Sequence, residues 1–204
     1  MTNDTDLQQA DNQQIRRGRL QLAAILGIVA VPVLVSYFMF YTGIGVPTDT
    51  VNKGVLIEPP VAIGAARLSD DAGQDWSLAE QGPVFKLLQF VGGDCAENCR
   101  TLLYNARQVH TRLGKEASQV LRLAVHTGNL SQATRELLAR DYPKAVVLSG
   151  DYPQWQALLP DGDPSNTERL YVVDRRGFLV MYYTPNHSGG ELLKDLNRLV
   201  KTVQ

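Results

Sequence analysis

The chain has 204 residues, with 20 Lys and Arg against 21 Asp and Glu, so its net charge is close to zero. This length is enough for one ordinary domain and an additional segment. Basic residues are mixed with acidic ones along the chain, which argues against an electrostatic surface for nucleic acid. We therefore expect no nucleic acid among its partners.

The first recognisable element is an uncharged run at residues 20–41, LQLAAILGIVAVPVLVSYFMFY. About 22 helical residues, each rising about 1.5 Å, cover the hydrocarbon core of a bilayer, which is about 30 Å thick. No polar face interrupts the run, as one would in a surface helix of a soluble protein. The sequence predicts a transmembrane helix at 20–41, preceded by a cytoplasmic tail at 1–19.

The charges beside this run predict its orientation. Arg16, Arg17 and Arg19 precede it, whereas only Lys53 lies close beyond its other end. Because Lys and Arg are retained on the cytoplasmic side, we expect a single-pass protein of a bacterial-type inner (plasma) membrane with a periplasmic C-terminal domain. A cleaved signal peptide is the alternative, with small residues at 43–45. The run is longer than the apolar region of about 7–15 residues in such peptides, which favours a retained anchor.

The rest of the chain alternates between strand and helix patterns. Residues 42–65 are rich in turn formers and include Pro59 and Pro60, which predicts an extended tether. A domain at 66–204 follows. Its first half is predicted to contain a hairpin around 70–73, a buried strand at 83–91 and a helix ending at Gly114. Strands at 120–126 and 145–149 follow, separated by a helix capped by Ser131. The domain is then predicted to end with a short helix, a strand pair turning at Gly177, and a last helix with a Ser188/Glu191 capping box. This order predicts an α/β fold with a mixed sheet covered on both faces.

Cys95 and Cys99 are the only cysteines and directly follow the predicted strand at 83–91. Asp94 and Glu97 match a capping box, which predicts that Cys95 is the first helical residue and Cys99 the fifth. Residues four apart share one helical face, with Cα atoms about 6 Å apart, a separation that a disulfide tolerates. Periplasmic conditions permit such a bond.

The cysteine spacing favours chemistry over a purely structural role. A disulfide closing so short a loop gains little stabilisation, because the loss of chain entropy grows with loop length. The positive end of the helix dipole would stabilise a thiolate at Cys95, making it a nucleophile and a soft-metal ligand. We therefore take Cys95 and Cys99 as the candidate catalytic pair.

Two stretches resemble the Sco family of thioredoxin-fold proteins, membrane-anchored factors for cytochrome c oxidase assembly. These are ARLSDDAGQDWSLAEQGPVFKLLQFVGGDCAENC and LYVVDRRGFLVMYY. The resemblance covers residues 66–204 and the anchor. It implies a thioredoxin-like mixed sheet flanked by helices, Cys95 and Cys99 as copper ligands, and a cytochrome c oxidase subunit or another assembly factor as partner besides the bilayer.

The chain also departs from the Sco pattern. Sco proteins carry a proline between the two cysteines and a copper-binding histidine before the penultimate strand, whereas this chain has CAENC and, at the second place, Asn166. Of its three histidines, His110 is expected to pack inside a helix and His126 to end a strand. His126 and His187 are the remaining candidates for a third copper ligand, and His187 is favoured because it lies in the loop before the last helix, which can move.

Three functions follow from these residues. The first is thiol-disulfide exchange that keeps the cysteines of an oxidase subunit reduced during assembly. The second is a Cu(I) chaperone using Cys95 and Cys99, since thiolates favour soft ions. The third is a non-catalytic assembly factor that uses the fold for docking. The sequence leaves open whether the protein is an enzyme.

Overall fold

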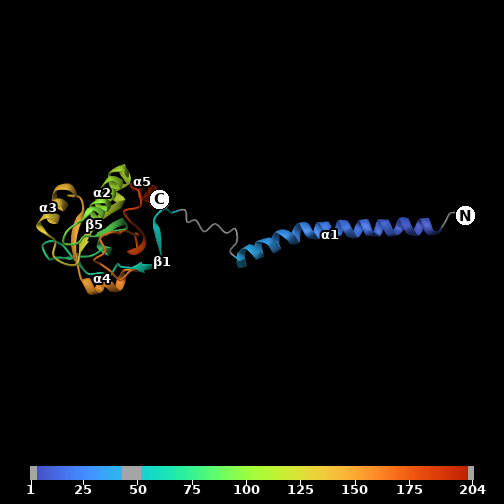
Figure 1. Ribbon diagram of the computed structural model, residues 1–204, viewed down its shortest axis with the longest axis horizontal. Coiled ribbons are helices and arrows are strands. Elements are labelled where there is room, and N and C mark those ends of the chain that lie inside the picture. The colour runs from blue at the N-terminus through green and yellow to red at the C-terminus, as the bar shows by residue number, and fades with distance from the viewer. Residues whose placement is uncertain (1–3, 43–51, 202–204) are drawn as a thin grey trace. The chain divides into compact units, whose positions relative to one another are not determined.

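The computed structural model describes residues 4–42 and 52–201. The chain folds as two compact units, Met1–Thr50 and Val51–Gln204, and each is described by itself. In Figure 1 the first unit runs from dark to light blue, and the second from cyan to red.

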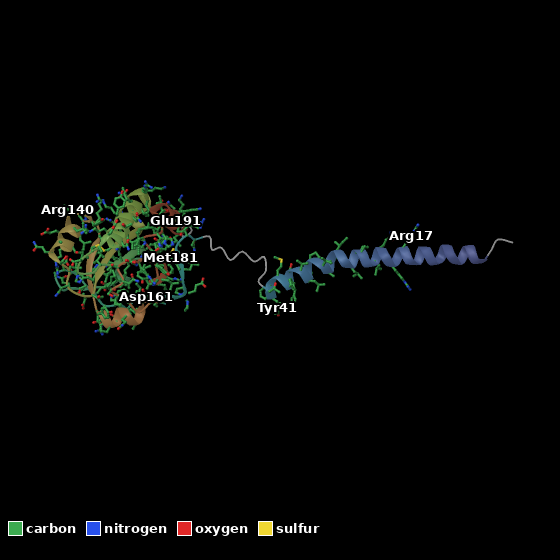
Figure 2. All side chains as sticks on the ribbon, in the orientation of Figure 1. Arg17, Tyr41, Arg140, Asp161, Met181 and Glu191 are labelled. Atoms are coloured by element: carbon green, nitrogen blue, oxygen red, sulfur yellow. A yellow bond between two sulfur atoms is a disulfide. The ribbon has the colours of Figure 1, made fainter. Side chains whose placement is uncertain are left out.

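The first unit is one helix, α1 (Asp4–Thr42). Its apolar stretch Ala24–Thr42 is long enough to cross a membrane. The side chains described in this stretch are exposed almost throughout, and Figure 2 shows them standing away from the ribbon between the labelled Arg17 and Tyr41. Pro32 does not end the helix. The helix predicted at 20–41 thus lies within α1, which begins earlier, inside the predicted tail, and α1 is a candidate membrane span.

The second unit is built on one mixed sheet of eight strands in the order β1-β8-β7-β4-β5-β6-β2-β3. Strands β4, β5 and β6 are parallel, and the other pairings are antiparallel. The strands are β1 (Val55–Ala62), β2 (Leu68–Ser69), β3 (Asp75–Trp76), β4 (Phe85–Phe90), β5 (Val120–His126), β6 (Val146–Gly150), β7 (Leu170–Val173) and β8 (Phe178–Tyr183). The helices are α2 (Glu97–Arg112), α3 (Gln132–Asp141), α4 (Tyr152–Leu158) and α5 (Gly189–Lys201), with 3-10 turns η1 (Ala79–Gln81) and η2 (Gly114–Gln119).

Helices cover both faces of this sheet (Figure 1). On one face, Trp155 of α4 packs in a cluster with Leu88 and Phe90 of β4. On the other face, alternate residues of the same strand, including Leu87, pack in a cluster with α2 and α5. Because β4 is buried on both faces, all six of its residues are apolar or have their polar groups covered. The predicted α/β fold, a mixed sheet flanked by helices, is confirmed.

Several local predictions are also confirmed. Strand β5 has the predicted bounds, and the turn between β7 and β8 has Gly177 at φ +86°, a conformation that favours glycine. Ser131 accepts a hydrogen bond from the Thr134 N–H at the start of α3. At α5, the Ser188 N–H donates to the Glu191 carboxylate (2.8 Å) and the Glu191 N–H donates to Ser188 Oγ (3.3 Å), as in a capping box.

The tether predicted at 42–65 is wrong in its second half. Residues 55–62 form β1, an edge strand paired with β8. The pairing skips from Leu56 to Val61, so Pro59 and Pro60 lie in an irregular stretch where no ladder hydrogen bond is required of them. Pro59 and Pro60, which favour a loop, are thus compatible with an edge strand. Residues 43–51 of the predicted tether lie outside the described residues.

A buried carboxylate fixes the start of β1. Oδ2 of Asp195, on α5, accepts hydrogen bonds from the backbone N–H groups of Lys53 (2.6 Å) and Gly54 (3.0 Å) and from the Tyr183 hydroxyl (2.8 Å). Burial and Asp195 together raise the pKa of Tyr183. Gly54 lies against the Tyr183 ring, so close that a Cβ would come within 2.6 Å of it. Segment 53–54 is therefore held by a specific contact with α5 and β8.

Candidate functional site

Cys95 lies in the connection from β4 to α2, at the carboxyl end of a central parallel strand, and Cys99 lies in the first turn of α2. The structure joins them in a disulfide with Cα atoms 5.3 Å apart. The predicted proximity of the two cysteines is confirmed. We call residues 92–99, which run from the end of β4 into the first turn of α2, the cysteine loop.

The predicted start of the helix is wrong by two residues. Helix α2 begins at Glu97, its N-cap is Ala96, and no side chain caps it. Cys95 therefore precedes the helix, and Cys99 is its third residue. The Asp94/Glu97 pattern fails because Thr134 of α3 accepts the hydrogen bond of the Cys95 N–H and holds Cys95 outside the helix. The helix dipole thus acts on Cys99 at least as directly as on Cys95.

Three hydrogen bonds tie Cys95 and its neighbour Gly93 to other elements. The Cys95 N–H donates to Thr134 Oγ1 (3.1 Å), and that hydroxyl donates to the Gly93 carbonyl (2.9 Å). Arg100 Nε donates to the Cys95 carbonyl (2.9 Å). Thr134 is buried and lies on α3, so the position of the cysteine loop depends on α3 as well as on α2.

A buried glutamine of β4, Gln89, contacts Cys99. Gln89 Nε2 donates to the Cys99 carbonyl (2.9 Å), which fixes the first turn of α2 over β4. Gln89 Oε1 is buried and has no hydrogen-bond partner among the described residues. A polar residue inside the apolar run at 83–91 was a visible sequence signal for such a role, but the sequence interpretation did not use it.

The two sulfurs are shielded from solvent. Cys95 is 3% exposed and Cys99 is fully buried. Both belong to an apolar cluster that also contains Val91, Leu103, Ala124, Leu130, Leu138 and Tyr142. Burial raises the pKa of the Tyr142 hydroxyl, and the negative charge of the nearby Asp141 raises it further. In the disulfide form Cys95 is therefore closed to solvent, because α2 and α3 cover it.

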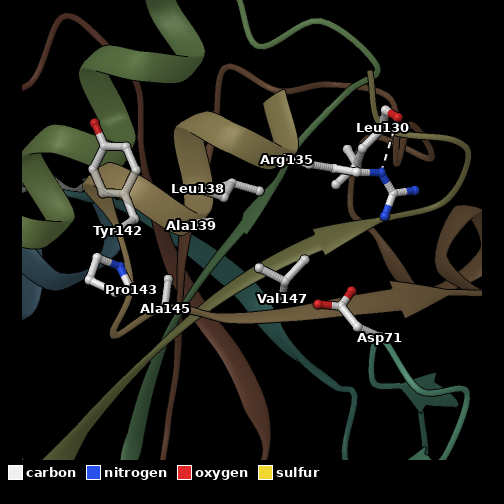
Figure 3. Close-up of a pocket in the computed structure, with 9 residues that line it drawn as sticks. All are labelled: Asp71, Leu130, Arg135, Leu138, Ala139, Tyr142, Pro143, Ala145 and Val147. Atoms are coloured by element: carbon white, nitrogen blue, oxygen red, sulfur yellow. Dashed lines mark hydrogen bonds between the residues drawn. The ribbon is translucent and has the colours of Figure 1, made fainter. Parts of the chain in front are cut away.

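A cavity of about 390 Å³ borders the same apolar cluster. Figure 3 shows Leu138 and Tyr142 of the α3 region on one side of it and Val147 of β6 below. Arg135, whose Nε donates to the Leu130 carbonyl, and Asp71 from the β2–β3 turn stand at its polar end. The disulfide and this cavity thus share one set of packing residues.

The chain segment before β7 reaches the cysteine loop without a histidine. Asn98 Nδ2 donates to Glu168 Oε1 (2.9 Å). Asn166, at the place of the Sco histidine, donates to Asp161 (3.1 Å) and accepts from the Glu168 N–H (3.0 Å). This segment therefore contributes the Glu168 carboxylate to the cysteine loop, a contact that the sequence did not predict.

The three histidines have other partners. His187 Nδ1 accepts from the Thr184 N–H (3.0 Å), and its ring lies edge-on to Tyr183. His126 Nδ1 is 2.6 Å from the Gly128 carbonyl. His110 Nε2 lies 3.1 Å from the Val120 carbonyl, and burial lowers the pKa of its imidazole. The prediction that His110 is a packing residue fits these contacts, whereas His187 is fixed in its own turn.

These residues supply only some of the ligands of the copper site that the Sco resemblance implies. Among residues 4–42 and 52–201, no three His, Cys, Asp or Glu side chains are grouped so that they could hold a metal ion. Cys95 and Cys99 would supply two thiolates after reduction, and neither His187 nor Asn166 completes a third position. The donor set fits a soft ion of low coordination number better than Cu(II).

Comparison with known families agrees with the two-unit organisation. A family model described as a transmembrane-like, thioredoxin-like C-terminal domain matches residues 85–203, and one described as a transmembrane-like N-terminal domain matches residues 13–43. The chain belongs to this transmembrane-like, thioredoxin-like family. The N-terminal match supports α1 as a membrane anchor. No sequence among the curated proteins matches this chain.

Solved structures similar to this family member include Sco proteins. Apo Sco1 from Thermus thermophilus has 18% identity and a TM-score of 0.58, covering 74% of this chain and 99% of that one. Yeast Sco1 with copper bound has 15% identity and a TM-score of 0.56, with coverage of 76% and 96%. Arabidopsis thaliana ScoI with copper bound has 15% identity and a TM-score of 0.55, with coverage of 69% and 99%. The predicted resemblance to Sco proteins is confirmed in the fold.

Proposed function

We propose that this protein is a membrane-anchored thiol-disulfide exchange protein that keeps the cysteines of a membrane-bound oxidase subunit reduced during assembly. The observation that carries the proposal is the Cys95–Cys99 disulfide at the β4–α2 connection of a thioredoxin-like sheet. The bond closes a loop too short to gain much chain entropy, so a role in electron transfer explains it better than a role as a staple. The choice of an oxidase rests on the likeness to Sco proteins.

The exchange reaction needs two thiols and one target disulfide. In the reduced protein the Cys95 thiolate attacks a sulfur of the target, a mixed disulfide forms, and one target thiolate leaves. Cys99 then attacks Cys95 Sγ, which forms the Cys95–Cys99 disulfide and releases the second target thiol. Two electrons pass to the target, and a second dithiol protein must return them. Cys95 takes the first step because it is the less buried of the pair.

The proposal includes an orientation and a location. Arg16, Arg17 and Arg19 before the apolar stretch favour a cytoplasmic N-terminus. The domain Val51–Gln204 would then lie in the periplasm of a bacterial-type cell, where disulfides persist. A reporter that is active only outside the cytoplasm, fused after Gln204, should be active. A cytoplasmic C-terminus would contradict this part of the proposal.

Cu(I) delivery is the second candidate, and the adjacency of the two sulfurs favours it. With copper as cargo, Cys95 and Cys99 would be its two thiolate ligands. We expect the reduced protein to bind at most one Cu(I), and to lose it in Cys95→Ser or Cys99→Ser. His187→Ala should change binding little, because His187 is held by Thr184. Tight Cu(II) binding that His187→Ala abolishes would support copper delivery with a third ligand instead.

Burial of both sulfurs is the observation that favours a non-catalytic docking factor with a structural disulfide. The reduction potential separates this function from exchange. The full chain in detergent is equilibrated with glutathione buffers, and the Cys95–Cys99 pair is trapped by alkylation. A functional pair should titrate above about −300 mV, the upper range of structural disulfides. A lower potential, or no exchange with a small disulfide by the reduced protein, would contradict the proposal.

A further inference from the structure

A second cavity, of about 370 Å³, lies at the opposite end of the central strands from the cysteine loop. It is lined by residues of α2, of η2 before β5, and of the segment between α3 and β6. Since β4 and β5 are parallel and the cysteine loop follows the carboxyl end of β4, this cavity is separate from the disulfide.

The base of the cavity is a buried arginine. Arg122, on β5, is 7% exposed and lies on the strand face shared with Val120 and Ala124. Its Nε is buried and has no hydrogen-bond partner, and none of the ion pairs among the described residues includes Arg122. Taking a charged guanidinium out of water without a partner is costly. A buried arginine that faces a cavity without a counter-charge is an observation that points to a ligand.

The walls add positive charge. Arg107 and Lys144, both exposed, line the cavity together with His110. Arg107 is held there because its Nη1 donates to the Asp141 carbonyl (2.8 Å). Asp141 is the one carboxylate of the lining, and its side chain pairs with Arg140 at 2.9 Å. Three permanent cations thus converge on a space whose only acid already has a partner.

The effects on pKa agree with this charge distribution. Burial and then repulsion by Arg107 lower the pKa of Arg122. Burial, followed by repulsion from Arg122, lowers the pKa of His110, and Lys144 acts in the same direction. An anion in the cavity would offset these repulsions.

We propose that this cavity binds a phosphate group, either as a free phosphate ester or as the headgroup of an anionic phospholipid, with Arg122 at its base and Arg107 and Lys144 at its rim. A guanidinium presents paired N–H donors that match two oxygens of a phosphate. Three cations suit a phosphate group, which offers several oxygens as acceptors, better than a single carboxylate. The proposal is independent of the cysteines, so it stands or fails separately from the proposed exchange activity.

Inorganic phosphate is the first probe. The full chain in a neutral detergent is melted at constant ionic strength while phosphate replaces chloride. We expect a saturable rise in melting temperature that is absent in Arg122→Gln. Arg107→Gln and Lys144→Gln should each raise the apparent Kd about tenfold, as expected for the loss of one charged contact. These two exposed positions keep the test informative if Arg122→Gln fails to fold.

Lys194→Gln is the matched control. Lys194 is an exposed lysine on α5, outside the cavity lining. Its substitution should leave the phosphate response unchanged. No response of the unmodified chain, or an equal response in Lys194→Gln, Lys144→Gln and Arg107→Gln, would overturn the site.

Nanodiscs distinguish the two sources of phosphate. The chain is reconstituted in phosphatidylcholine, with or without phosphatidylglycerol, and titrated with phosphate. If the headgroup occupies the site, phosphatidylglycerol raises the melting temperature of the unmodified chain but not of Arg122→Gln, and added phosphate has no further effect. If the ligand is a soluble ester, the phosphate titration is the same in both lipids.

Discussion

Segment 53–54 and the cysteine loop are both fixed to the thioredoxin-like domain, but by different chemistry. At segment 53–54, a single buried carboxylate oxygen of Asp195 accepts three hydrogen bonds. At the cysteine loop, a covalent bond joins Cys95 to Cys99, and neutral or exposed polar contacts surround it. Only the second can be released by two electrons. We therefore expect reduction to loosen the cysteine loop while the start of β1 stays in place.

The largest expected effect comes from removing the carboxylate. Asp195→Ala leaves two backbone N–H groups and the Tyr183 hydroxyl without their acceptor, so the free energy of unfolding should fall by about 2–4 kcal/mol. Urea unfolding followed by tryptophan fluorescence measures this, because both tryptophans, Trp76 and Trp155, lie in the second unit. Asp195→Asn, which retains one acceptor oxygen, should cost less. A loss below 1 kcal/mol in Asp195→Ala would show that this carboxylate does not fix segment 53–54.

The second effect tests how closely segment 53–54 is packed. In Gly54→Ala the new Cβ would lie 2.6 Å from the Tyr183 ring, and Tyr183 is only 2% exposed. Overpacking at such a site should cost about 1–3 kcal/mol. Gly64→Ala is the matched control, since no atom lies within 4 Å of its Cβ. Equal stability of the two variants in the same urea experiment would argue against tight packing at Gly54.

A third change acts on the cysteine loop. Thr134→Ala removes the acceptor of the Cys95 N–H and the donor to Gly93. We expect a loss of about 1–2 kcal/mol, together with faster reduction of the disulfide by a small dithiol. Thr111→Ala, which removes an exposed hydroxyl of α2, should change neither quantity appreciably. Unchanged reduction kinetics in Thr134→Ala would mean that α3 does not control access to Cys95.

The smallest effect is expected at the surface of the cysteine loop. Glu168→Ala removes the exposed hydrogen bond from Asn98, and the free energy of unfolding should change by less than about 0.5 kcal/mol. Urea unfolding again provides the measurement. A change above 1 kcal/mol would show that the segment before β7 holds the loop more firmly than its exposure indicates.

The strands and helices of the domain could be predicted because their signals are local. Strand β5 has seven residues of β-forming pattern between clear breaks, and the Ser188/Glu191 pair marks the start of α5 unambiguously. The Asp94/Glu97 pattern looks the same but misleads, because Thr134 holds Cys95 outside the helix from a position far along the chain. A local pattern does not carry that information.

The closeness of the two cysteines was predictable from the sequence, but their surroundings were not. The spacing of Cys95 and Cys99 predicts a Cα separation near the 5.3 Å that the structure has. The burial of both sulfurs depends on α3 and β5, which pack over the loop through residues remote in sequence. Strand β1 was missed for the same reason, since its partner β8 and its anchor Asp195 lie more than a hundred residues further on.

The two prolines of β1 have a consequence for association between copies of the chain. A strand at the margin of a sheet offers free N–H and C=O groups, and a strand from a second molecule can pair with them. Pro59 and Pro60 are exposed, lack N–H groups, and lie where the ladder to β8 is already interrupted. The outer side of β1 is thus a poor template for another strand, which protects the sheet from growing into an aggregate at this margin.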